Sequence, residues 1–340
     1  MTKVRARRVL EALLVCSALT GCDQGSPDLS ASGGPPLHIS SSYPDYGASL
    51  DCAPDDLGCG VPRNVAFEFR FDRFLRPDTA IRQSMTLYTG KPSNLVPSSN
   101  RVAEITPAYD LVERVVRFSL PDGFVLHENA LYTFELPVPD EAAPFGFTAF
   151  DGAALAPDTP RSVSFVTSNQ TEERPAEPAP PSCDVVVSLF AGCASAACHG
   201  GETPRMGLDL TSTEAIRRTA IGRVAHQTEV ADSAGVALQD PARMGVAMPI
   251  IDPHRPDNSY LLYKLLISTD NYAAPDECES AFRAPVDPEL CTRASDAELA
   301  RLRDGFVRGE PMPHPASENR LGPEALRSIS RFIRAGASCP

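Results

Sequence analysis

Beyond its first 22 residues the sequence has no apolar run long enough to cross a membrane, since a spanning helix needs about 20 apolar residues. It also has no catalytic triad, no phosphate-binding loop and no zinc-protease motif, so its polar residues do not indicate an enzyme. Basic residues are few: 31 Lys and Arg stand against 44 Asp and Glu, a net charge of −13. Such a chain repels nucleic acid and anionic lipid, and suits a cationic partner or a basic patch on a partner protein.

Tryptophan is absent, whereas proline is abundant, with 33 of the 340 residues. The proline content indicates turns, extended strands and linkers. The hydrophobic content of 42% is enough to bury cores, and the length suits two ordinary domains.

The N-terminal end has the pattern of a secretory signal. A basic stretch from Lys3 to Arg8 precedes a short apolar run over residues 12–19, and Leu19-Thr20-Gly21-Cys22 resembles the lipobox of bacterial lipoproteins. We therefore expect cleavage after residue 21 and lipidation of Cys22. A transmembrane anchor is the alternative, but the apolar run is too short for one. The mature chain is expected in the cell envelope, lipid-anchored to a membrane and facing the periplasm or the cell surface.

The cysteines fit an oxidising compartment, where disulfides persist. Of ten cysteines, Cys16 is removed with the signal and Cys22 carries the lipid. Six of the remaining eight pair naturally as neighbours, and the predicted disulfides are Cys52–Cys59, Cys278–Cys291 and Cys183–Cys339. Cys193 and Cys198 remain.

The composition changes along the chain and predicts five segments. Residues 1–21 are the signal peptide, 22–60 a flexible spacer rich in Gly, Ser, Pro and Asp, and 171–182 a stiff Pro-rich linker. Residues 61–170 alternate apolar and polar positions as β-strands do, and residues 183–340 have helical periodicity. The predicted strands are 65–71, 84–89, 101–106, 112–119, 130–136 and 162–167.

Residues 61–170 resemble the bacterial Ig-like domains of the S-layer type. The resemblance is carried by Pro62-Arg63-Asn64, Leu131-Tyr132-Thr133-Phe134, Asp151-Gly152 with Leu155, and Phe165-Val166-Thr167. It implies a β-sandwich that acts as a spacer or adhesion module, and we identify no chemistry in this segment.

Residues 183–340 contain several amphipathic helices. We expect Ser182 to cap a helix that runs to Cys193, and Ser295 to cap one over residues 296–307. Two further helices are expected over residues 213–224 and 259–266, and Pro323 begins the last helix, which ends near Gly336.

One motif in this helical segment carries chemistry. Cys193 and Cys198 are followed at once by His199, which resembles the C-x-x-C-H signature of covalent haem attachment with two extra residues between the thiols. In such a site the thiols bond the haem vinyl groups and the histidine binds the iron. A second ligand comes from later in the chain. Met312, in Met312-Pro313, is the best candidate and Met248 the second, while Met206, Met244 and His254 are weaker.

The helical segment as a whole resembles the planctomycete-type cytochrome c-like domains of secreted and lipidated bacterial proteins. The residues that carry this resemblance are Phe190, Cys193, Cys198-His199-Gly200, Gly207-Leu208-Asp209-Leu210, Pro256-Asp257-Asn258-Ser259-Tyr260-Leu261, Lys264-Leu265, Met312-Pro313, Leu321 and Ile333-Arg334-Ala335-Gly336-Ala337. The fold implied for the whole chain is an all-β Ig-like sandwich followed by a mainly α cytochrome c-like domain.

The sequence leaves two functions open. The first is a membrane-tethered electron carrier with one haem c on an Ig-like stalk and an unidentified redox protein as its partner. The second is a haem-free cell-envelope lipoprotein with a structural or interaction role, in which Cys193 and Cys198 form a disulfide. Zinc binding is a third reading of the cysteines, but adjacent Cys198 and His199 seldom converge on one ion.

The predicted lipidation can be tested at Cys22. Because cleavage follows lipidation of that thiol, Cys22→Ala should accumulate a precursor that still carries residues 1–21, which a mass spectrum of the purified chain would show. Cys16→Ala is the control and should be processed normally. Normal cleavage and membrane partitioning of Cys22→Ala would contradict the prediction.

Overall fold

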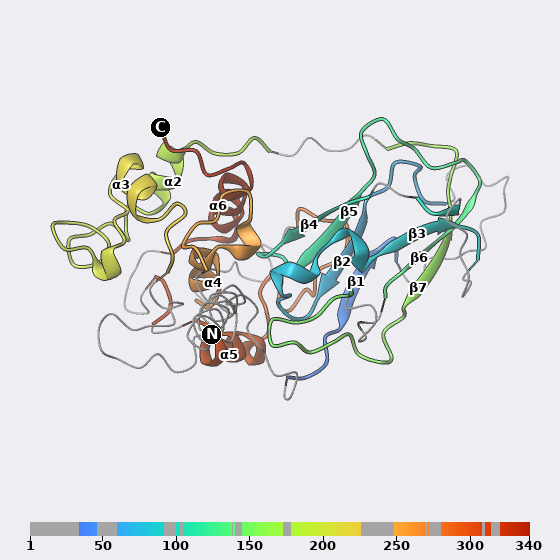
Figure 1. Ribbon diagram of the computed structural model, residues 1–340, viewed down its shortest axis with the longest axis horizontal. Coiled ribbons are helices and arrows are strands. Elements are labelled where there is room, and N and C mark those ends of the chain that lie inside the picture. The colour runs from blue at the N-terminus through green and yellow to red at the C-terminus, as the bar shows by residue number, and fades with distance from the viewer. Residues whose placement is uncertain are drawn as a thin grey trace, which may run out of the picture.

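The chain folds into a β-rich unit and a helical unit that lie against each other, as the computed structural model shows (Figure 1). The structure describes residues 34–45, 60–91, 100–102, 105–137, 139, 145–172, 178–225, 248–268, 271, 280–307, 310–313 and 320–340. Cys22, Cys52, Cys59, Met244 and Cys278 lie outside these residues.

Two antiparallel sheets form the β-rich unit. One has the strand order β1-β2-β5-β4 and the other the order β3-β6-β7. The bounds are β1 Ile39–Tyr43, β2 Phe67–Phe71, β3 Thr86–Thr89, β4 Thr106–Asp110, β5 Val115–Ser119, β6 Leu131–Glu135 and β7 Ser162–Val166.

Phenylalanine rings fill the space between the sheets. The Phe69 ring of β2 lies 5.1 Å from the Phe134 ring of β6, and the Phe67 ring lies 5.5 Å from the Phe165 ring of β7. These are the apolar positions of the alternating sequence, which places every second side chain of a strand on one face. The Phe69–Phe134 pair is edge-to-face and the Phe67–Phe165 pair is tilted, and such ring pairs add to the burial of apolar area in stabilising the core.

The structure corrects two strand predictions. Residues 39–43 were expected in the spacer but form β1, which pairs with β2. Their sequence, Ile-Ser-Ser-Ser-Tyr, has no apolar alternation, so the strand depends on the hydrogen bonds that β2 offers. The strand expected over residues 101–106 lies later, as β4, whose ladder with β5 runs from Thr106 to Asp110.

The helical unit contains the expected helices, most of them shorter than predicted. Their bounds are α2 Cys183–Leu189, α3 Thr213–Thr219, α4 Tyr260–Leu266, α5 Asp296–Gly305 and α6 Pro323–Arg334. Ser182 and Ser295 accept hydrogen bonds from the third residue after each of them, so both predicted N-caps are confirmed. In the part of the chain that the structure describes, no helix combines the length and the apolar character that a membrane span requires.

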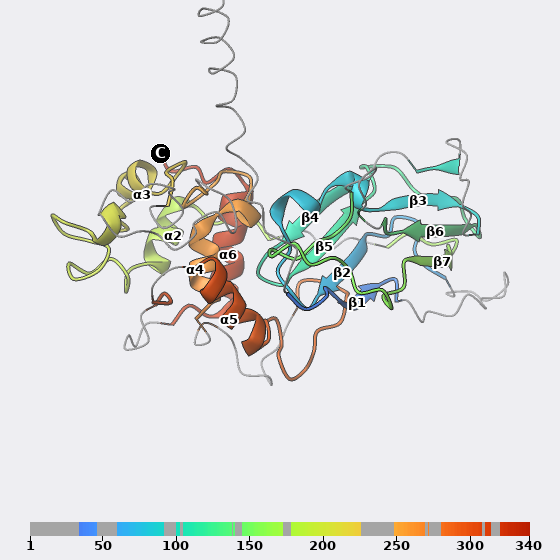
Figure 2. The same cartoon turned by 60° about the horizontal axis from the view of Figure 1, so that its bottom comes forward.

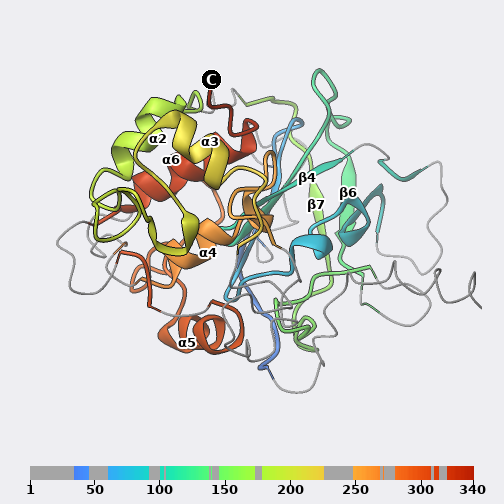
Figure 3. The same cartoon turned by 60° about the vertical axis from the view of Figure 1, so that its left-hand side comes forward.

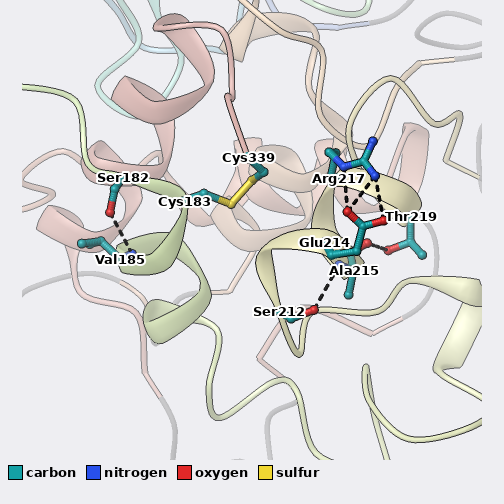
Figure 4. The surroundings of a disulfide bond; sticks show 9 residues. All are labelled: Ser182, Cys183, Val185, Ser212, Glu214, Ala215, Arg217, Thr219 and Cys339. Carbon is teal, nitrogen blue, oxygen red and sulfur yellow. Dashed lines mark hydrogen bonds and ion pairs between the residues drawn. A yellow bond between two sulfur atoms is a disulfide. The ribbon is translucent and has the colours of Figure 1, made fainter.

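The Cys183–Cys339 disulfide joins the two ends of the helical unit, as predicted (Figure 4). It holds the start of α2 beside the chain end that follows α6, and α2 packs against α6 (Figure 3). The bridge closes a loop with a sequence separation of 156, so it restrains the unfolded chain by about 4–5 kcal/mol in the entropic account. Cys291 is also disulfide-bonded. Its predicted pairing with Cys278, like Cys52–Cys59, stays a prediction.

Residues 280–293 of the helical unit cover the outer face of the four-stranded sheet (Figure 2). The Glu68 and Arg70 side chains point to that face, as the alternation predicts, yet each is only 2% exposed. Glu68 accepts hydrogen bonds from the backbone N–H groups of Arg283 and Ala284, at 2.6 and 3.0 Å. The polar face of the sandwich is therefore an internal interface, in contrast to the separate stalk and carrier that the sequence suggested.

Two buried carboxylates hold the units together. The fully buried Glu113 of the β-rich unit forms ion pairs at 3.1 Å with Arg70 and with Arg327 of α6. Glu298 of α5, also fully buried, lies 2.9 Å from the Arg73 guanidinium and accepts the Phe74 N–H at 3.0 Å. Glu113 thus supplies the counter-charge of the buried Arg70, and Glu298 shares that of the buried Arg73 with Asp151, which lies 2.6 Å from the guanidinium.

This interface predicts the effect of Glu113→Gln. The change leaves Arg70 and Arg327 without their shared counter-charge, so the free energy of unfolding should fall by about 3–5 kcal/mol in a urea titration. Glu214→Gln is the matched control, because the Glu214–Arg217 pair is more than half exposed and should cost less than about 1 kcal/mol. Equal effects of the two changes would refute the role given to Glu113.

Candidate functional site

The cysteine-histidine motif forms a compact turn after α2. The Cys193 N–H donates to the Phe190 carbonyl at 2.8 Å, and the His199 N–H donates back to the Cys193 carbonyl at 3.0 Å. Within the turn the Cys198 N–H donates to the Ser195 carbonyl at 2.9 Å. The turn therefore accommodates the two residues by which this motif exceeds the usual C-x-x-C-H spacing, and it brings the backbone of His199 back to that of Cys193.

Gly200 follows the histidine at a close approach of two chain segments. A Cβ atom at this position would overlap with the Ala194 carbonyl oxygen. A glycine is therefore required here because the two segments lie too close together for a side chain, and not because the backbone is left-handed. It lets the segment after His199 pass against the start of the turn.

The His199 imidazole is 8% exposed and oriented by the backbone. Its Nδ1 lies 3.2 Å from the Leu208 carbonyl oxygen. Burial lowers the pKa of His199, which favours the neutral ring. Backbone hydrogen bonds to Leu208 and Arg205 raise the pKa, but each has a smaller effect than burial. A neutral imidazole whose Nδ1 is bound to a carbonyl presents Nε2 to a metal, which is the usual arrangement of a histidine ligand.

Cys193 and Cys198 are both free in the structure and both half-buried. Burial raises the pKa of the Cys193 thiol, and the nearby Cys198 raises it further. A raised pKa disfavours the thiolate, so Cys193 is not arranged as an activated nucleophile. Free thiols at this spacing suit thioether formation, and they leave the disulfide alternative open.

Zinc binding receives no geometric support. Among the residues placed by the structure, no group of three or more His, Cys, Asp or Glu side chains is arranged to hold a metal ion. A zinc site needs four ligands, or three and a water molecule.

Met312 lies partly buried against the core of the helical unit. Its N–H donates to the Lys264 carbonyl of α4 at 3.3 Å, and its own carbonyl accepts from the Asn271 side chain at 3.1 Å. The Met312 backbone is thereby attached to the C-terminal part of α4.

The other candidate ligands have different surroundings. Met248 is 4% exposed, and its carbonyl accepts the Ala225 N–H at 3.0 Å. Met206 is 55% exposed. The His254 ring packs on Gly336 after α6, and its Nδ1 lies 3.3 Å from the Arg334 carbonyl oxygen. His254 is thus engaged at the end of α6, whereas Met248 remains the second choice.

Two polar residues of this region were not identified as functional from the sequence. Lys264 is 8% exposed in a helix whose residues are all buried, and burial lowers the pKa of its ammonium group to about 8 against the opposing effect of Glu310. The sequence feature that could have identified Lys264 is its position as the single lysine in the apolar run Tyr-Leu-Leu-Tyr-Lys-Leu-Leu. Asn271, which is fully buried, had no comparable signal, because its partners come from distant segments.

Comparisons with known proteins give little further information. No protein-family model and no curated protein matches the chain. Among solved structures it is similar to domains 1–6 of the surface layer protein SbsC and to the S-layer protein rSbsC(31-844), at 12% and 11% identity. Both matches cover 44% of this chain and 15% of the other, with a TM-score of 0.23.

A third match is the N-terminal part of the bacterial S-layer protein SbsC, at 12% identity. The match covers 44% of this chain and 25% of that chain, with a TM-score of 0.21. The chain thus spans a quarter or less of the length of these three structures. Likeness at these TM-scores carries no conclusion about function.

The close approach at Gly200 generates a prediction. Gly200→Ala forces the Ala194 carbonyl away and should lower the free energy of unfolding by about 1–3 kcal/mol, as overpacking does. Ala197→Ser adds one atom to an exposed position of the same turn and should stay within about 0.5 kcal/mol. Thermal melts of both variants check this, and an undiminished stability of Gly200→Ala would contradict the geometry.

Proposed function

We propose that this chain is a membrane-tethered lipoprotein that carries one covalent haem c and transfers electrons to a partner redox protein. The observation that carries the proposal is the turn after α2, where two free cysteines precede a buried histidine whose Nδ1 is bound to a backbone carbonyl. The lipid at Cys22 and the location in the cell envelope rest on the sequence pattern.

The residues present fit such a group. Cys193 and Cys198 would hold the haem through thioethers, His199 would supply the proximal ligand and Met312 the distal one. When bound, the haem iron supplies one-electron chemistry. The chain contributes an imidazole oriented by the Leu208 carbonyl, and an apolar core against which Cys193 and Met312 pack.

The geometry assigns no catalytic role. The His199 Nδ1 is bound to the Leu208 carbonyl, and burial raises the pKa of the Cys193 thiol, so the two are not arranged as a base and an activated nucleophile. These features support a carrier rather than an enzyme. A methionine opposite a histidine places the potential of a haem higher than a second histidine would, because thioether sulfur is a soft ligand.

The proposal is tested by maturing the full chain in the presence of haem-attachment machinery. We expect a red protein whose haem survives denaturing electrophoresis, and loss of that haem from the Cys193→Ala, Cys198→Ala double variant. A colourless chain whose mass shows a Cys193–Cys198 disulfide would overturn the proposal in favour of the haem-free envelope protein.

The distal ligand is tested by Met312→Ala. This change should abolish the weak sulfur-to-iron absorption band of the oxidised protein and lower its midpoint potential, while the covalent haem stays because the thioethers are elsewhere. Met248→Ala is the matched control and should leave both quantities unchanged. Loss of the band in Met248→Ala but not in Met312→Ala would show that the wrong methionine was chosen.

A further inference from the structure

Asn271 joins three segments of the helical unit through its side chain. Its Nδ2 donates to the Leu265 carbonyl at 2.9 Å and to the Met312 carbonyl at 3.1 Å. Its Oδ1 accepts the Leu321 N–H at 3.0 Å. The side chain is fully buried and thereby connects the end of α4, the Met312 segment and the chain that enters α6.

The partners of Asn271 fix which way its amide points. Two of them are carbonyls that need donors, and the third is an N–H group that needs an acceptor, so a flipped amide would lose all three hydrogen bonds. A buried backbone group without a partner is costly, which makes this arrangement stiff.

The Met312 backbone is consequently held from both sides. Its N–H is bound to the Lys264 carbonyl and its C=O to Asn271, so the two peptide groups flanking its Cα each have a fixed partner. Fixing both peptide groups fixes the direction of the Cα–Cβ bond, and hence the region that the thioether can reach. The first anchor, Lys264, belongs to α4, and the second, Asn271, comes a few residues after the end of that helix.

We propose that Asn271 is a positioning residue for the distal ligand. By binding the Met312 carbonyl it would limit the region that the Met312 thioether can reach, and it would act through Met312 rather than on the iron. This role rests on the proposed haem site. It assigns a function to a buried polar residue in a unit whose core is otherwise largely apolar, and it explains why one side chain bonds the backbone of three separate segments.

The test compares Asn271→Asp and Asn271→Ala in the full haem-loaded chain. Asn271→Asp keeps an acceptor for Leu321 but places an oxygen against the Met312 carbonyl, and Asn271→Ala removes all three bonds. Ser259→Ala is the matched control, because Ser259 is also fully buried before α4 and, among the described residues, its Oγ bonds the Asp252 N–H and the Arg255 carbonyl. Urea titrations of all variants record the general loss of stability.

The readouts are the sulfur-to-iron band and the affinity of the oxidised protein for added imidazole, which competes with Met312. Both Asn271 variants should weaken the band and bind imidazole about tenfold or more tightly than the wild type, the equivalent of one buried hydrogen bond. Ser259→Ala should change neither readout at a comparable loss of stability.

Wild-type values in both Asn271 variants, or equal changes in Ser259→Ala, would overturn the positioning role while leaving the haem in place. Met312→Ala must itself raise the imidazole affinity. If it does not, Met312 is not the ligand, and the role of Asn271 falls with it. A wild-type chain without haem would instead refute the proposed function.

Discussion

The burial of carboxylates between the two units is the constraint on which the rest of the structure depends. Glu113 and Glu298 are each fully buried and face arginines that are themselves almost inaccessible. Coulombic attraction in such a setting is strong, but so is the cost of removing the charges from water, so the network specifies the docking geometry more than it adds net stability. With that geometry fixed, residues 280–293 cover the sheet and α4 is enclosed.

The core of the sandwich and the helices of the other unit were largely predictable, because both follow from local periodicity. The alternation at Val65, Phe67, Phe69 and Phe71 predicted the inner face of β2, and serines before apolar stretches predicted two helix starts. The same alternation could not show that Glu68 and Arg70 are buried. The residues that cover them, Arg283 and Ala284, lie more than 200 residues later in the chain, and no local pattern encodes which surface will do so.

The candidate site was likewise predictable only in part from the sequence. The spacing of Cys193, Cys198 and His199 identified the motif, but not the turn that accommodates the two extra residues or the carbonyl that orients the imidazole. Met312 was recognisable by its residue type and its place before α6. Lys264 stood out as a single lysine in an apolar run, but its burial could not be foreseen, and Asn271 gave no comparable signal. Burial depends on how α4 packs between distant segments.

Because α4 packs against the β-rich unit, a substitution in one unit can affect the other. Tyr263 is fully buried, its ring lies 6.3 Å from the Phe74 ring of the β-rich unit, and the next residue is Lys264. One helix thus packs against the sandwich through Tyr263 and binds the Met312 N–H through the Lys264 carbonyl. Substitutions at Phe74 would therefore alter the packing of a helix that holds the Met312 backbone, so the two units are not interchangeable modules.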